Sequence, residues 1–151
     1  MQKSLEQFLT LSALLTGFSR FQLLGLDIAA DHLATCRAMF PEGVLDELLA
    51  AWSNLTARDD LEAAVEVSIV LDPKLWPVAE NLILLWYTGS WTMLSDSWHS
   101  VYGASPLEKA GVVSARSYLA GLQWKAAGAH PAGSAQQGFA SWSRAPKGAA
   151  Q

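Results

Sequence analysis

The histidines and the cysteine are the side chains best suited to metal chemistry, so their spacing is considered first. His32 and Cys36 lie four residues apart, and on one helix this spacing lets two side chains contact the same metal ion. Two ligands do not make a site, and neither His99 nor His130 has a partner at ligand spacing. The sequence therefore predicts no metal site.

Acidic residues cluster once, near the expected start of a helix, at Asp59, Asp60, Glu62 and Glu66. Carboxylates are favoured at the positive end of a helix dipole, so this cluster predicts a solvated helix face. The chain has no nucleophile elbow, phosphate-binding loop, dinucleotide fingerprint or Cys-x-x-Cys-His haem motif. We expect no catalytic residues and no enzyme activity; an enzyme with an unrecognised site is the least favoured alternative.

The composition is apolar and poor in charge. Hydrophobic residues make up 51% of the chain, mean hydropathy is +0.18, and only 16% of residues are charged, against about 25% in an average domain. The longest apolar run, Leu82 to Tyr87, has six residues, far fewer than the roughly 20 of a membrane-spanning helix. No direct membrane span is expected, and we infer that another protein covers part of the apolar surface.

Charge is unevenly distributed along the chain. Residues 1–108 hold all 14 acidic residues and five basic ones, whereas residues 109–151 hold five basic residues and no acidic one. An acidic body lacks the dense basic patch of a nucleic-acid-binding protein, so no nucleic acid is expected. The basic residues near the C-terminus suit an acidic surface on a protein partner. Cys36 is the only cysteine and is expected to be a buried, inert side chain.

Apolar residues recur at helical spacing over the first 88 residues and predict an all-α fold. The first helix is expected to open with a capping box at Ser4. Pro41 ends the second helix, Gly89 ends the fifth, and Pro77 is tolerable only in a first turn. The expected helices span about 4–16, 28–39, 43–54, 59–72 and 74–88. Together they predict a compact bundle of about five to six helices.

A long aromatic loop, residues 86–102, is expected to follow the bundle. Its aromatic residues argue against disorder, and loops of such length are commonly functional. Ser105, Pro106 and Glu108 combine an N-cap, a first-turn proline and a capping box. They predict another helix to about Trp124, with a break at Gly111 and a restart at Ser114.

The last segment, residues 126–151, is rich in Ala, Gly and Ser and cannot build its own core. Phe139 and Trp142 stand within it, which favours an extended arm that inserts aromatic side chains into a partner; a disordered end is the alternative. We therefore expect a helical domain over 1–125 and an arm over 126–151. The expected partner-binding residues are Trp86, Tyr87, Trp91, Trp98, Tyr102, His130, Pro131, Phe139 and Trp142. Trp86 and Tyr87 end the most apolar helix and suit the core equally well.

Three segments, in this order, resemble one family. Phe8–Gly17 (FLTLSALLTG) is similar to the opening of the small subunits of membrane-bound, FAD-dependent sugar and sugar-alcohol dehydrogenases. Leu85–Trp91 (LWYTGSW) resembles the central Trp-Tyr-x-Gly motif of that family. The C-terminal part of this chain resembles the sorbitol dehydrogenase branch of the family. The residues that carry this resemblance are Tyr118–Trp124, Gly128–Pro131, Phe139 and Trp142. The related complexes oxidise sorbitol, fructose, gluconate or glucose.

The resemblance implies a division of labour. In such complexes a large subunit carries FAD and oxidises the sugar, and electrons often leave through a separate multihaem cytochrome c subunit. The small subunit binds and stabilises the large one and often supplies a twin-arginine export leader. The resemblance thus implies a non-catalytic small subunit without a cofactor of its own.

Location and substrate follow less directly. Only seven residues precede Phe8, and they contain no twin-arginine pair. The expectation is the periplasmic face of the inner membrane if a leader has been removed, and the cytoplasm otherwise. The sugar belongs to the partner and cannot be read from this chain. The alternative function is a stand-alone helical binding module with an apolar pocket between its helices.

Overall fold

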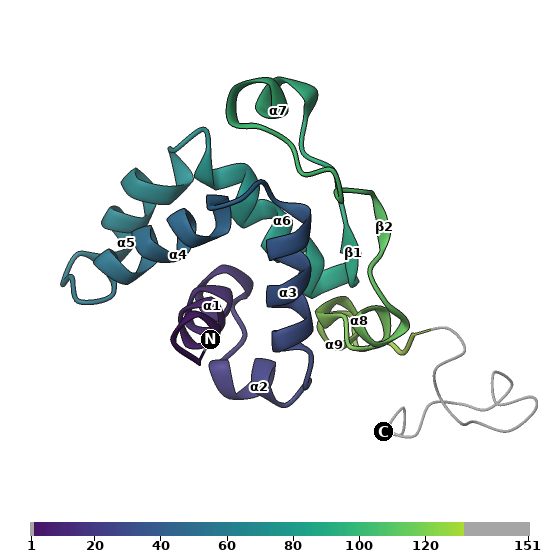
Figure 1. Cartoon of the computed structure of the whole chain (residues 1–151). Helices are drawn as coiled ribbons and strands as arrows, with labels where there is room; N and C mark the ends of the chain where they lie inside the picture. Colours follow the sequence, from purple (N-terminus) through teal and green to yellow (C-terminus); the bar gives the residue numbers. More distant parts are fainter. Residues whose placement is uncertain (1, 132–151) are drawn as a thin grey trace, which may run out of the picture.

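Helix α1 (Gln2–Thr16) lies at the centre of the molecule, and helices α2, α3, α4 and α6 all contact it (Figure 1). The computed structural model describes residues 2–131, which are mostly helical. The expected all-α fold class is therefore confirmed. Between residues 2 and 131, no helix has both the length and the hydropathy needed to cross a bilayer.

The helices predicted from apolar spacing are found close to their expected limits. They are α3 (Ala29–Met39), α4 (Val44–Leu55) and α6 (Leu75–Thr88). Pro77 is the third residue of α6 and so lies in its first turn, where its missing N–H has no helical partner to lose. Gly89 caps α6 with a left-handed φ of 67°, as a C-terminal glycine is expected to do.

The helix expected from Asp59 has two parts. Helix α5 (Leu61–Val65) continues directly into the π-helical segment η1 (Glu66–Val70). The Leu71 backbone N–H donates to the Glu66 carbonyl, five residues back, at 2.9 Å. Ile69, which lies within this wider turn, is fully buried, and the five-residue spacing of the hydrogen bond cannot be read from the sequence pattern.

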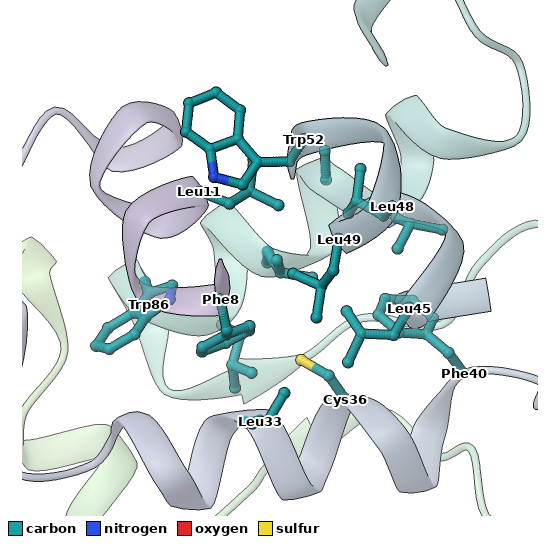
Figure 2. Close-up of a cluster of buried hydrophobic side chains, with 14 of the residues drawn as sticks. Phe8, Leu11, Leu33, Cys36, Phe40, Leu45, Leu48, Leu49, Trp52 and Trp86 are labelled. Atoms are coloured by element: carbon teal, nitrogen blue, oxygen red, sulfur yellow. The ribbon is translucent and has the colours of Figure 1, made fainter. Parts of the chain in front are cut away.

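The core forms where α1, α3, α4 and α6 converge (Figure 2). Cys36, expected to be inert, is among these buried side chains. The other residues labelled in this cluster in Figure 2 are Phe8, Leu11, Leu33, Phe40, Leu45, Leu48, Leu49, Trp52 and Trp86. Burying a side chain of this size contributes about 1.5–3 kcal/mol, so this cluster is the main source of stability.

Polar contacts fix the register of α1 against α6. The Trp86 indole N–H donates to Ser12 Oγ at 2.9 Å, and the Tyr87 hydroxyl donates to the Thr16 carbonyl at 2.9 Å. The Phe8 and Trp86 rings lie 6.1 Å apart. We call these three contacts the α1–α6 lock. They join the two segments Phe8–Gly17 and Leu85–Trp91.

Helix α2 (Arg20–Leu24) was not expected from the sequence pattern. Ser19 and Gln22 form a complete capping box, in which Ser19 Oγ accepts from the Gln22 N–H and Gln22 Oε1 accepts from the Ser19 N–H. By contrast, α1 begins at Gln2, so the capping box expected at Ser4 does not open it. One turn of helix carries too little periodicity to be detected, which is why α2 was missed.

The long aromatic loop expected over residues 86–102 is wrong in part. It contains strand β1 (Ser90–Trp91) and helix α7 (Asp96–Tyr102). Strand β1 pairs antiparallel with β2 (Gly111–Val112), so the chain leaves the body and returns beside itself (Figure 1). The helix expected from Ser105 does not form, because residues 105–110 are turn and coil.

The expected restart at Ser114 is confirmed. Ser114 Oγ accepts from the Ser117 N–H at the start of α8 (Ala115–Leu119), and α9 (Leu122–Ala126) follows. Both short helices contact α6. The approach is backbone to backbone: a Cβ on Gly89 would lie 2.3 Å from the Ser117 carbonyl carbon. A Cβ on Gly121 would lie 2.7 Å from the Tyr87 carbonyl oxygen.

Gly89→Ala should therefore destabilise the protein by about 2–4 kcal/mol, since it adds a steric clash to the strain of a left-handed backbone. Gly17→Ala is the matched control, because Gly17 has a φ of 75° with nothing within 4 Å of the added Cβ. The control should cost only about 1 kcal/mol. Urea unfolding of both variants measures the difference, and equal losses would contradict the close packing of α8 on α6.

Candidate partner-binding surface

The five aromatic residues predicted to bind a partner from residues 86–102 face the body of the protein. Trp86, Trp91 and Trp98 are buried, and Tyr87 and Tyr102 are half-buried. Each of the three indole N–H groups has an acceptor within the chain. A buried indole needs such an acceptor. The three tryptophans are thus core residues in this structure, in agreement with the alternative core assignment of Trp86, and their part in binding a partner stays a prediction.

Glu108 organises the segment between β1 and β2. Its side chain is only 2% exposed, and its Oε1 accepts from the Trp91 indole N–H at 3.3 Å and from the Leu94 backbone N–H at 3.1 Å. Its Oε2 lies 2.7 Å from His99 Nε2, at ion-pair distance, although the ring N–H does not point at it as in a hydrogen bond. One carboxylate thus joins the two ends of the chain segment that runs from Trp91 to Glu108.

The same carboxylate explains the missing helix. In a capping box, a glutamate at this position turns back to the N–H of the capping residue. Glu108 instead points into the body, and Ser105 Oγ donates to the Ala38 carbonyl at the end of α3, at 2.6 Å. Ser105 Oγ also accepts from the Leu107 N–H at 3.2 Å, so a local turn forms, but the Glu108 carboxylate that would complete the capping box is used in a long-range contact.

Helix α7 is attached to the start of α6. The Trp98 indole N–H donates to the Lys74 carbonyl at 3.1 Å, and the Trp98 ring lies 5.2 Å from the Tyr102 ring. The Lys74 ammonium lies 5.8 Å from the centre of the Tyr102 ring and pairs with Glu47 of α4. Trp98 and Tyr102 therefore hold α7 on the body and leave Val101 facing outward.

The remaining predicted contact residues belong to the C-terminal part. His130 is exposed and Pro131 is half-buried. Phe139 and Trp142 lie outside the described residues. In the part of the chain that precedes His130, the Trp124 indole N–H donates to the Tyr118 carbonyl at 2.8 Å, and the two rings lie 5.4 Å apart. This contact accounts for the Tyr118–Trp124 motif as a local fold element.

His32 and Cys36 are both buried on α3, and no group of three or more metal-binding side chains occurs among residues 2–131. The His32 ring stands edge-on to Trp86, 4.6 Å between ring centres, and neither ring nitrogen has a hydrogen-bond partner among the residues that the structure describes. Burial lowers the pKa of His32 from 6.5 to about 4. Burial also raises the pKa of the Cys36 thiol, so it carries no reactive thiolate.

A surface hollow of about 570 Å³ lies between the α3–α4 turn and residues 103–107. Phe40, Pro41 and Leu107 contribute apolar surface, and Arg37 pairs with Asp46 at its edge, 3.2 Å apart. It is a depression at the surface, whereas the alternative function expected an apolar pocket between helices. Its lining holds no buried charged group that would define a reaction.

Exposed apolar side chains, which composition alone could not locate, are the feature best suited to partner binding. Phe21 of α2 is 85% exposed, the highest value among the large hydrophobic residues of 2–131. On η1 and just after it, Val67 and Leu71 are 69% and 67% exposed. Others of this kind are Leu14, Leu24, Val70, Leu84, Met93, Val101, Leu107, Val112 and Leu119.

Comparisons of this chain with protein-family models, with curated proteins and with solved structures found no match. The three motif segments are therefore interpreted from their contacts. Phe8–Gly17 and Leu85–Trp91 form the α1–α6 lock, and Tyr118–Trp124 packs on the end of α6. All three contribute to the same packing unit of the fold.

Replacing Glu108 tests its role in joining the two ends of the Trp91–Glu108 segment. Glu108→Ala should lower the free energy of unfolding by about 3 kcal/mol, because two buried N–H groups lose their acceptor. Glu108→Gln keeps an amide oxygen for both donors and should lose about 1 kcal/mol. Urea unfolding followed by tryptophan fluorescence compares them, and equal losses would show that Oε1 is not the acceptor that matters.

His32 predicts a pH dependence of stability. Its pKa is about 4 in the folded chain and about 6.5 when unfolded, so between these values the unfolded state binds more protons. Stability should fall as pH drops from about 6.5 to about 4, by about 3 kcal/mol in all. His32→Leu should remove this component in chemical unfolding series at each pH. Parallel stability curves for the two proteins would disprove the assignment.

Proposed function

We propose that this chain is a non-catalytic small subunit that binds and stabilises the large, FAD-carrying subunit of a sugar or sugar-alcohol oxidoreductase. The observation that carries the proposal is the set of large apolar side chains left exposed outside a well-packed core, led by Phe21 at 85% exposure. Phe21 and Leu24 lie three residues apart on α2 and hence on one side of it, and exposed apolar surface that gathers in this way is typical of a surface covered by another protein. Phe21, Leu14 and Leu24, on α1 and α2, are the contact residues proposed first.

The contacts of the motifs support this proposal. Residues of Phe8–Gly17 and Leu85–Trp91, the segments that resemble the small-subunit family, hold α1 against α6. A subunit whose motifs maintain its own fold leaves the oxidation chemistry to its partner. We therefore propose FAD in the partner, a cytochrome c subunit as electron acceptor, and no cofactor in this chain.

Location and the C-terminal contacts belong to the same proposal. A complex of this type works at the periplasmic face of the inner membrane, and a chain without an export leader would work in the cytoplasm. His130, Pro131, Phe139 and Trp142 stay predicted contacts, with the last two outside the described residues. In this proposal they extend the apolar surface of the body.

Co-expression with the large flavoprotein encoded beside this chain tests the proposal. A yellow complex should elute from size exclusion, with a mass by light scattering equal to the sum of the two subunits. Phe21→Ser should weaken the complex at least tenfold, yet change the unfolding free energy by less than about 0.5 kcal/mol because Phe21 is exposed. A colourless monomer that ignores the flavoprotein would refute the proposal.

The second candidate, a stand-alone binding module, is favoured by the hollow between the α3–α4 turn and residues 103–107. A hollow of about 570 Å³ falls within the roughly 300–1,000 Å³ range of small-molecule sites. This candidate predicts that the lone chain is a stable monomer and that Leu107→Trp, which fills the hollow, abolishes ligand binding. The co-expression experiment separates the two candidates, because a stand-alone module gains nothing from the flavoprotein.

A further inference from the structure

Helix α5 and segment η1 carry a continuous outward face that the fold does not use. Its residues recur at the spacing that places side chains on one side of a helix. Two of them, Val67 and Leu71, are more than two-thirds exposed. We call this set the α5–η1 face, and it consists of Asp59, Glu62, Ala63, Glu66, Val67, Val70 and Leu71, all exposed.

The opposite side of the same segment satisfies the core. Ala64 and Ile69 are buried against the body. Ile69 lies within the π-helical turn Glu66–Val70, and Val67 and Val70, on either side of half-buried Ser68 and buried Ile69, are exposed. Core packing therefore accounts for Ile69, whereas Val67, Val70 and Leu71 remain 69%, 37% and 67% exposed.

The face has a polar end and an apolar end. Asp59, Glu62 and Glu66 surround a hollow of about 430 Å³, and Val67, Val70 and Leu71 follow it. Asp60 is paired with Arg58 through two hydrogen bonds of 2.8 Å. Asp59, Glu62 and Glu66 make no ion pair within residues 2–131.

The helix dipole accounts for only part of this pattern. Acidic residues before and within the first turn, such as Asp59 and Glu62, stabilise a helix start. Glu66 lies beyond the first turn of α5 and gains little from the dipole. Nor does a dipole account for aliphatic side chains on the same side. Unpaired carboxylates beside exposed aliphatic groups complement a surface with the opposite charge and its own apolar residues.

We propose that the α5–η1 face binds a cationic amphipathic helix of a partner protein. The helical segment that carries the face, from Leu61 to Leu71, is about 15 Å long at about 1.5 Å per residue. This length matches three turns of a docking helix. Lys or Arg residues of that helix pair with Glu62 and Glu66, and its Leu, Ile or Phe residues cover Val67, Val70 and Leu71. A second copy of this chain is disfavoured, because two such acidic faces would repel each other.

A synthetic 14-residue leucine–lysine amphipathic helix is the probe, and a leucine–glutamate helix of equal length is its control. The lysine peptide should bind the full chain, shift the amide resonances of residues 59–71, and lose affinity with added salt. Val67→Asp should weaken binding at least tenfold. Val101→Asp on α7 is the matched control, since both valines are 69% exposed, and it should change binding less than threefold.

Charge variants separate a local effect from net charge. Glu62→Lys with Glu66→Lys should abolish binding, whereas Glu42→Lys with Glu80→Lys makes the same change in net charge elsewhere and should leave most of it. Equal effects of the paired variants would overturn the proposal, as would equal binding of both peptides. A dimer that Val67→Asp dissociates would also overturn it and assign the face to a second copy. Circular dichroism confirms that each variant is folded.

The inference rests on the proposed function for the identity of the partner, but not for the chemistry of its helix. A photo-cross-linker at position 67, in the complex with the flavoprotein, should capture a basic helical segment of that subunit. If the complex forms but only a cross-linker at position 21 captures the flavoprotein, the inference fails and the proposed function stands. If no complex forms but the lysine peptide binds at residues 59–71, the proposed function fails and the inference stands.

Discussion

The hydrogen bond from the Trp86 indole to Ser12 Oγ is the contact on which most of the structure depends. It fixes the register of α1 against α6, and those two helices contact most of the other elements. Its neighbour, from the Tyr87 hydroxyl to the Thr16 carbonyl, extends the lock to the end of α1. Because both donors stand in the last turn of α6, the position of Gly89 and of the helices packed on it is set by the same contacts.

Tryptophan in this protein serves the interior more than the surface. The indole N–H groups of Trp52, Trp86, Trp91, Trp98 and Trp124 each donate to a specific oxygen within the chain. A chain of this length can bury large apolar area with few residues by using indoles, provided that every N–H finds an acceptor. The apolar composition therefore reflects a tryptophan-rich core as well as the exposed aliphatic groups on α2 and η1.

Sequence periodicity was sufficient for the long helices and insufficient for the contacts between them. Helices α3, α4 and α6 follow from apolar spacing and from Pro41 and Gly89, which act locally. The acceptor of the Trp86 N–H lies 74 residues away, so the local apolar pattern allowed a core position for this indole but could not identify its partner. Glu108 has the spacing of a capping box, but a partner 17 residues earlier claims its carboxylate. The π-helical turn leaves no mark in the apolar spacing, and the degree to which Val67 and Val70 are exposed becomes evident only in three dimensions.

The contact between the Gly89 and Ser117 backbones has a mechanical consequence. No side chain separates the Gly89 backbone from the Ser117 backbone. Helices α8 and α9 therefore have less freedom to shift on α6 than helices that are separated by a layer of side chains. A force applied near residue 126 is passed through this rigid joint to α6, and from Trp86 to the middle of α1. The C-terminal end of the described chain is thus rigidly connected, through α6, to helix α1. A force applied to this end of the chain would therefore be transmitted directly to the core.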